Sequence, residues 1–115
     1  MFSGCESLQS LDLSHFYTLN TYNMPFMFYN CFSLTSLNLN GFITRNTNDF
    51  SYMFYYCSKL TSLDLTTFSN EYCDQCGQLF EGCYDLTLYI NPNKCQMFMN
   101  NIPYYVKVIS VNSLL

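Results

Sequence analysis

The feature that most constrains the fold of this chain is a segment that recurs at a constant interval. Residues 1–13 read MFSGCESLQSLDL, residues 27–39 read MFYNCFSLTSLNL, and residues 53–65 read MFYYCSKLTSLDL, which gives a period of 26. A fixed period of this kind indicates a repeat architecture, in which no unit buries its apolar face alone. The recurring columns include Met1, Met27, Met53 and Leu79; Phe2, Phe28, Phe54 and Phe80; Cys5, Cys31, Cys57 and Cys83; and Leu8, Leu34, Leu60 and Leu86.

The leucines of each unit predict one short strand. They follow the pattern L-x-x-L-x-L-x-x-F, which resembles the leucine-rich-repeat template, and Leu11-Asp12-Leu13 alternates with the period of two typical of a strand. The leucines then point inward, and three polar columns point outward as candidate binding residues. These columns are Ser10, Ser36 and Ser62; Asp12, Asn38 and Asp64; and Ser14, Asn40 and Thr66.

The segment between two strands predicts a short helix. Asn23 and its equivalent Asp49 are suitable N-cap residues, and Pro25 is tolerated in a first helical turn. Met27, Phe28 and Cys31 then fall at helical spacing on one buried face. Each unit is thus expected to be a coil of strand, turn, short helix and return, and stacking of the coils makes the core.

We therefore predict a single α/β repeat domain over residues 1–115. It is a short leucine-rich-repeat solenoid with a parallel strand ladder, short helices opposite, and a C-terminal cap. The repeats span 1–26, 27–52, 53–78, and 79–83 leading into the cap, 84–115. Within the cap we expect a strand over 85–90 with Leu88 and Ile90 inward, a helix over 94–99 and a last strand over 105–111. The first repeat has no equivalent cap, which predicts an exposed N-terminal face and self-association through it, unless upstream repeats or a partner cover that face.

Composition excludes several classes of function. The net charge is −4 with only four Lys and Arg residues, so the chain lacks the basic surface that nucleic acids require. No run of about 18 apolar residues is present, which argues against a membrane span. His15 is the only histidine and belongs to no repeated column, and no nucleophile, base and orienting group are assembled around it. We expect no enzymatic activity and no cofactor.

The seven cysteines predict buried thiols for the most part. Four lie on the repeat column, where free cysteine behaves as a small core residue. Cys73 and Cys76 form a C-x-x-C pair, for which plain thiols are the favoured interpretation. A local disulfide is one alternative, and a metal or redox site that also uses Cys95 is another.

The motif M-F-x-x-C-x-x-L-x-S-L-x-L, repeated with this period, resembles the BspA-type leucine-rich repeats of bacterial and protist proteins. Residues 86–92, LTLYINP, are similar to the segment that opens the last unit of that family. The resemblance implies a surface-exposed protein that adheres to host proteins or to other cells. It favours a non-enzymatic protein-binding module, cell-surface or secreted, with a protein partner. Tyr29, Tyr55 and Tyr56, which we expect to be exposed, would suit such contacts.

The alternative is an intracellular structural or scaffold repeat protein in the cytoplasm. The thiol richness, the lack of a visible signal peptide and the lack of an N-x-[ST] sequon among 13 asparagines favour this hypothesis. A metal protein or enzyme built on Cys73, Cys76 and Cys95 is the third hypothesis.

Overall fold

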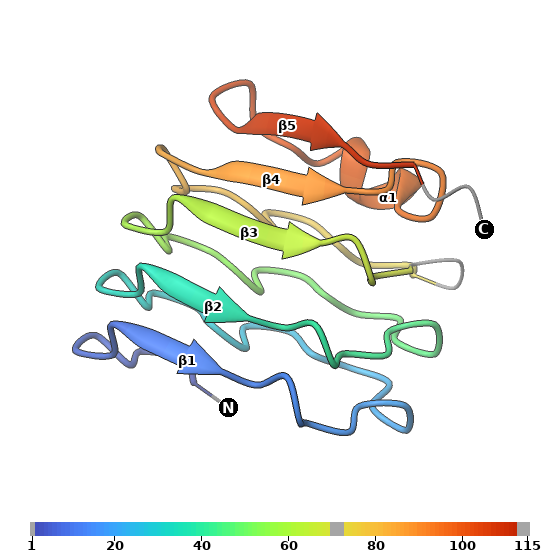
Figure 1. Ribbon diagram of the computed structural model, residues 1–115, viewed down its shortest axis with the longest axis horizontal. Helices are drawn as coiled ribbons and strands as arrows, with labels where there is room; N and C mark the ends of the chain where they lie inside the picture. Colours follow the sequence, from blue (N-terminus) through green and yellow to red (C-terminus); the bar gives the residue numbers. More distant parts are fainter. Residues whose placement is uncertain (1, 70–72, 113–115) are drawn as a thin grey trace.

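The computed structural model describes residues 2–69 and 73–112. Two parallel sheets and one short helix make up its regular structure (Figure 1). The strands follow one another in chain order along one side of the molecule, from β1 at one end to β5 at the other (Figure 1). The elements are β1 (Ser10–Asp12), β2 (Ser36–Asn38), β3 (Ser62–Leu65), β4 (Thr87–Ile90), α1 (Gln96–Met99) and β5 (Lys107–Ser110).

The repeat period sets the register of the strands. Leu11 of β1 faces Leu37 of β2, which lies one full period further along the chain. Leu63 of β3 faces Leu88 of β4, one residue short of the period. The predicted one-residue shift of the fourth strand is therefore confirmed, and Leu88 and Ile90 are both fully buried. A slip of one residue would turn every leucine of the strand outward, so burial fixes the pairing.

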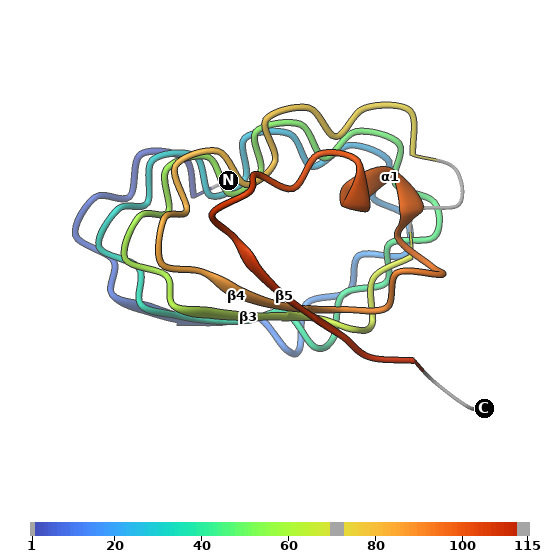
Figure 2. The same cartoon turned by 90° about the horizontal axis from the view of Figure 1, so that it is seen from above.

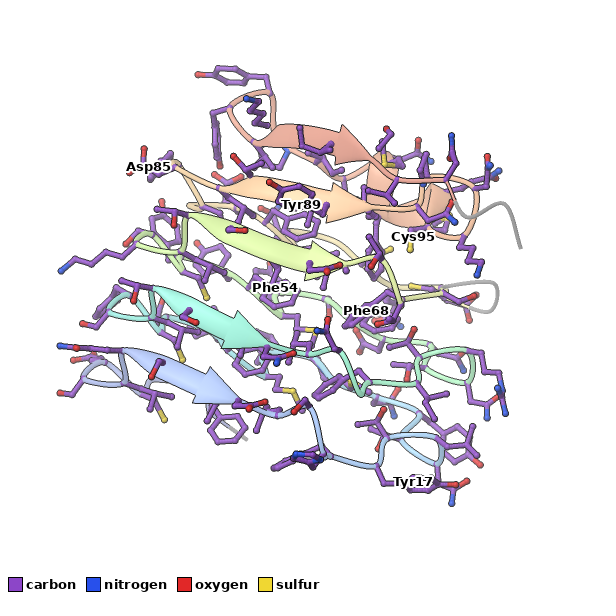
Figure 3. All side chains as sticks on the ribbon, viewed as in Figure 1. Tyr17, Phe54, Phe68, Asp85, Tyr89 and Cys95 are labelled. Carbon is purple, nitrogen blue, oxygen red and sulfur yellow. The ribbon has the colours of Figure 1, made fainter. Side chains whose placement is uncertain are left out.

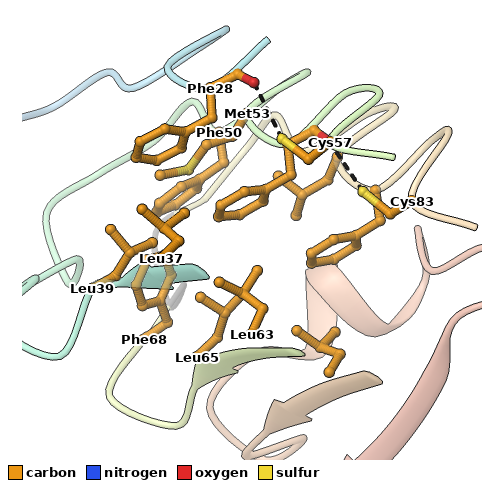
Figure 4. Packing of buried hydrophobic residues seen from close by; sticks show 14 of the residues in the cluster. Phe28, Leu37, Leu39, Phe50, Met53, Cys57, Leu63, Leu65, Phe68 and Cys83 are labelled. Atoms are coloured by element: carbon orange, nitrogen blue, oxygen red, sulfur yellow. Dashed lines mark hydrogen bonds between the residues drawn. The ribbon is translucent and has the colours of Figure 1, made fainter. Parts of the chain in front are cut away.

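Stacked aromatic rings fill the space behind the strands (Figure 4). Phe28 and Phe54 lie with ring centroids 5.7 Å apart, and Phe54 and Phe80 repeat the same spacing with nearly parallel rings. Equivalent side chains stack because neighbouring units are related by one strand spacing. Phe98 of α1 lies against the last ring of this stack, with its ring centroid 6.4 Å from that of Phe80 and at 79° to it.

The predicted short helices opposite the strands are wrong. Residues 25–30, 51–56 and 77–82 form consecutive turns, each with two residues in the left-handed region, which interrupts an α-helix. Asn23 and Asp49 pair as a parallel bridge instead of capping helices. The left-handed residues are Phe26, Asn30, Tyr52, Tyr56, Gln78 and Gly82, with φ between 56° and 85°.

These turns still form a ladder from one unit to the next. The amide of Phe28 donates to the carbonyl of Met53 at 2.9 Å, and the amide of Phe54 donates to the carbonyl of Leu79 at 3.1 Å. Because the backbone groups of each turn point at the neighbouring unit, they are satisfied without a helix. Figure 2 shows the result from above, with the turns superposed along one long side and the strands along the other.

The cysteine column contributes a second ladder. The thiols of Cys31, Cys57 and Cys83 donate to the carbonyls of Phe2, Phe28 and Phe54, respectively, at 3.0–3.2 Å (Figure 4). Cys57 and Cys83 are fully buried, and all seven cysteines are free thiols. This position therefore requires a small apolar side chain that also donates a hydrogen bond.

The two ends of the stack differ. β1 is an edge strand, and its Leu11 is only half-buried, whereas the equivalent Leu63 is fully buried. Phe16 is 40% exposed although its equivalents Phe42 and Phe68 lie in the core. At the other end β5 crosses obliquely over the last unit, beside α1 (Figure 2). The apolar interior is thus more open at the N-terminal end.

The buried thiols predict a loss of stability at alkaline pH. Burial raises the pKa of Cys83 and of Cys95 to about 12, and it raises the pKa of Cys57 as well. In the unfolded chain a thiol ionises near pH ~8.5, so only the folded state retains the proton above that pH. The stabilisation is complete below pH ~8 and falls, by about 1.4 kcal/mol per pH unit for each thiol, as the pH rises toward the folded pKa.

Urea unfolding of the reduced protein between about pH 7 and 9 measures this effect, because tyrosine, with a pKa near ~10, stays mostly protonated up to pH ~9. Cys83→Ala serves as the control, since it removes one thiol from the titration and should reduce the slope. A free energy of unfolding that stays constant to pH ~9 would contradict the burial of these thiols.

Candidate functional site

The predicted binding columns lie on the outer face of the sheets. Ser10 faces Ser36 and Asp12 faces Asn38 across the β1–β2 pair, while Ser62 lies in β3. Six of the nine residues are exposed, and Ser14, Asn38 and Thr66 are half-buried. No backbone pairing joins β2 to β3 in the part of the chain that the structure describes, although the two strands run side by side (Figure 1).

The side chains of the column Asp12, Asn38 and Asp64 accept hydrogen bonds from the backbone two residues further along the chain. One carboxylate oxygen of Asp12 accepts the amide of Ser14 at 2.9 Å, and the same contact joins Asp64 to Thr66 at 2.9 Å. The side chain of Asn38 holds the amide of Asn40 in the same way. Such bonds fix the turn that ends each strand. Hydrogen bonds from Ser14 also lower the pKa of Asp12, so its charge is committed to this turn.

The outward column continues beyond the predicted residues. Tyr89 of β4 lies in register with Asp64, and Ile109 of β5 lies in register with Tyr89. Figure 3 shows Tyr89 over β4, where it is 37% exposed. The polar face is therefore interrupted by apolar side chains toward its C-terminal end.

The C-x-x-C pair is a hydrogen-bonded pair of buried thiols. The Cys73 thiol donates to the sulfur of Cys76 at 3.4 Å. This bond raises the pKa of Cys73 and lowers the pKa of Cys76. The thiol of Cys95 donates elsewhere, to the carbonyl of Phe68 at 3.2 Å. Within residues 2–69 and 73–112, no group of three or more His, Cys, Asp or Glu residues is arranged to hold a metal ion.

A row of aromatic side chains runs along the turn side of the molecule, outside the core. The rings of Phe26 and Tyr52 stack with centroids 5.0 Å apart, and those of Tyr29 and Tyr55 stack at 4.9 Å. The row then continues ring by ring to the C-terminal end. We call this surface the aromatic strip; its members are Phe26, Tyr29, Tyr52, Tyr55, Tyr56, Tyr84, Tyr104 and Tyr105.

The prediction that Tyr29, Tyr55 and Tyr56 are exposed needs a correction. All three are half-buried and not fully exposed, because each stacks on neighbours from other units or from its own turn. Tyr56 lies directly over Gly82, where an added Cβ would come within 2.5 Å of the ring. The rings are consequently held in place and present mainly their edges and hydroxyl groups.

Three members of the strip occupy strained backbone positions. Phe26, Tyr52 and Tyr56 have φ of 59°, 58° and 56°, a conformation that bulky side chains rarely adopt. Each such residue costs about 1–2 kcal/mol relative to a right-handed conformation. In other units the position of Tyr56 is occupied by Gly4, Asn30 and Gly82, which are residue types suited to positive φ. The fold alone would therefore favour glycine or asparagine over these aromatic residues.

The sequence contained a signal for the strip. Phe26 and Tyr52 are one repeat period apart, and so are Tyr29 and Tyr55. An aromatic column outside the leucine and phenylalanine core columns is expected to stack in the same way as they do. The remaining members, Tyr56, Tyr84, Tyr104 and Tyr105, have no such periodicity, and the last three join the strip only through the path of the C-terminal segment.

Comparisons with known proteins place the sequence in one family. A family model described as "Mycoplasma protein of unknown function, DUF285" matches residues 1–105, which is nearly the whole chain. No curated protein matches the chain, and no solved structure does so. Within the described ranges, no helix has the length and apolar character needed to cross a membrane.

The strain at Tyr52 predicts an unusual response to truncation. Tyr52→Gly should change the free energy of unfolding by less than about 1 kcal/mol, because relief of the left-handed strain offsets the lost ring contacts. Tyr55→Gly is the matched control: its backbone is not left-handed, so it should be clearly more destabilising. Equal losses in the two variants, measured by urea unfolding, would show that Tyr52 is not strained.

Proposed function

The chain belongs to the family described as Mycoplasma protein of unknown function, DUF285, and from its geometry we propose that it is a non-enzymatic protein-binding module. The observation that carries this proposal is the aromatic strip, with three of its residues in left-handed conformations. Strained residues that folding does not require are concentrated at functional sites. Exposed tyrosine is also the residue type most suited to protein contacts, because a large apolar ring carries a polar hydroxyl group.

The proposed architecture is a short leucine-rich-repeat solenoid of the BspA type. Parallel strands whose partners lie one repeat period apart, and turns that bond to the equivalent turns of the next unit, support this assignment. In a solenoid each unit contacts only its neighbours and extends the same surface. The strip is the aromatic part of that surface, since its stacked pairs are equivalent residues of adjacent units.

Binding is more consistent with this surface than catalysis. Several groups that could act in a reaction are engaged in local structure: thiols of the cysteine column donate to carbonyls, and Asp12 and Asp64 hold turns. His15 is exposed in the loop after β1. The outer sheet face, with its serine columns, is the second surface available to a partner.

Site-specific photo-crosslinking in the source cells tests the binding function. A benzoylphenylalanine in place of Tyr104, which is 98% exposed in the strip, should give protein adducts, and the same replacement of Tyr89 on the sheet face should not. An excess of unmodified chain should suppress the adducts, and an excess of a Tyr52→Ser/Tyr84→Ser chain should not. Adducts from the Tyr89 position alone would indicate that the partner binds the sheet face. The absence of adducts from both positions would refute the proposed protein-binding function.

We further propose that the module acts in adhesion at the cell surface or after secretion. Its support is the resemblance of the repeats to BspA-type proteins. An intracellular scaffold in the cytoplasm is the alternative, and the seven free thiols favour it because secreted proteins usually carry their cysteines as disulfides.

Protease treatment of intact source cells, followed by mass spectrometry of the released peptides, distinguishes these two locations. Peptides of this chain released from unbroken cells would support adhesion. Peptides found only after lysis, with all cysteines available to a thiol reagent, would refute it and support the scaffold. A known cytoplasmic protein must stay unreleased in the same sample, since its release would reveal lysis.

A further inference from the structure

The aromatic strip has no face-to-face pair at its C-terminal end, as far as the described residues show. The nearly parallel pairs, such as Phe26 and Tyr52 at 8°, join equivalent residues of adjacent units and cover one face of each ring, whereas other contacts among the first rings are edge-on. At the C-terminal end the printed contacts are all tilted or crossed: Tyr84 is at 81° to Tyr56, and Tyr104 is at 79° to Tyr105. Crossed rings leave faces uncovered. Tyr84 is 51% exposed and Tyr104 is 98% exposed.

We call Tyr84, Tyr104 and Tyr105 the open end of the strip. Two of its rings, those of Tyr84 and Tyr105, are held by hydrogen bonds to the turns over residues 51–56 and 77–82. The amide of Gly82 donates to the Tyr105 hydroxyl oxygen at 2.9 Å, and the Tyr84 hydroxyl donates to that of Tyr56 at 3.3 Å. The rings of Tyr84 and Tyr105 are therefore fixed by hydrogen bonds, whereas the exposed ring of Tyr104 contacts Tyr105.

A carboxylate lies beside these rings. Glu81 belongs to the same turn, is half-buried, and its backbone carbonyl accepts the amide of Tyr56 at 2.7 Å. The hydrogen bond to Tyr56 and burial raise the pKa of Tyr84 to about 12, and the charge of Glu81 contributes to this shift. Burial raises the pKa of Tyr105, and Glu81 adds to that shift as well.

Carboxylates lie at and beside the open end. Besides Glu81, Asp85 follows Tyr84 in the chain and is exposed two residues before β4 (Figure 3). Two exposed lysines belong to neighbouring segments, Lys107 in β5 and Lys59 one repeat period before Asp85. The other two cations, Arg45 and Lys94, line a separate hollow. The open end thus combines aromatic faces with negative charge, on a chain whose net charge is −4.

We propose that the open end of the strip, together with Glu81, binds an arginine side chain of the protein partner. A guanidinium group is planar and stacks on a tyrosine face, and it donates charge-assisted hydrogen bonds to a carboxylate at the same time. Lysine offers a compact, strongly hydrated charge and cannot stack in this way. This inference rests on the proposed function and specifies the chemistry of the partner.

Titration of the full chain with Nα-acetyl-arginine methylamide, followed by NMR of the tyrosine and phenylalanine ring signals, tests the proposal. The signals of Tyr84, Tyr104 and Tyr105 should shift and saturate in the millimolar range, and those of Phe26 should stay unchanged. Nα-acetyl-citrulline methylamide has the same shape without the charge and should give no saturating shift. Equal affinity for Nα-acetyl-lysine methylamide would overturn the assignment to arginine.

Two charge-removing variants complete the test. Glu81→Gln should weaken arginine binding about tenfold, whereas Glu6→Gln, which removes an exposed carboxylate from the first unit, should leave it unchanged. Equal binding by the Glu81→Gln chain would overturn the proposed role of Glu81. If arginine does not bind while Tyr104 still forms protein adducts in cells, this inference fails and the binding module stands; if neither is observed, both fail.

Discussion

The structure depends on hydrogen bonds between equivalent backbone groups of successive units. In the turn over residues 25–30, alternate amides donate to carbonyls of the next unit, from Phe26 to Ser51 and from Phe28 to Met53. A turn with left-handed residues cannot satisfy these groups internally, and leaving them buried and unpaired would be unfavourable. The next unit is therefore the necessary partner of each turn. The strand pairs and the thiol hydrogen bonds also join one unit to the next. A single spacing between units therefore satisfies the hydrogen-bonding groups of the strands, the turns and the cysteines together.

The same relation explains what the sequence could predict. The repeat period defined the columns, and once the strands pair in that register the burial of Leu63, Phe54 and Cys57 follows. The shift at Leu88 was also readable, because the fourth unit alternates one residue earlier. At these positions the local sequence pattern and the contacts between units require the same residues, so the pattern alone is enough to predict the structure.

The predicted helices failed because the local pattern was ambiguous. Met27, Phe28 and Cys31 are buried as expected, but turns with two left-handed residues bury them as well as a helix would. The residue types did not indicate a positive φ at Phe26 or Tyr52, since bulky aromatic residues disfavour that conformation. For the same reason the positions of the nine outward polar residues could be predicted, but their local role could not. The hydrogen bond that the Ser14 amide donates to Asp12 depends on a turn that the spacing does not specify. Tyr29, Tyr55 and Tyr56 were predicted as contact residues, but their stacking with the other rings of the aromatic strip was not predicted.

The strain at the turns bears on why these rings are present. Three left-handed aromatic residues together cost about 3–6 kcal/mol, which is a considerable fraction of the ~5–15 kcal/mol that stabilises a typical domain. Part of that cost is recovered by stacking, at about 0.5–1.5 kcal/mol for each aromatic pair. Glycine or asparagine would reduce the strain, as Gly4, Asn30 and Gly82 do at the position equivalent to Tyr56, while the position of Tyr52 is occupied by Phe26 and Gln78 in the neighbouring units. Stability alone therefore gives no reason for tyrosine at residues 52 and 56. The proposed contact of the rings with a partner would supply one, because it would add a stabilising term that exists only when the partner is bound.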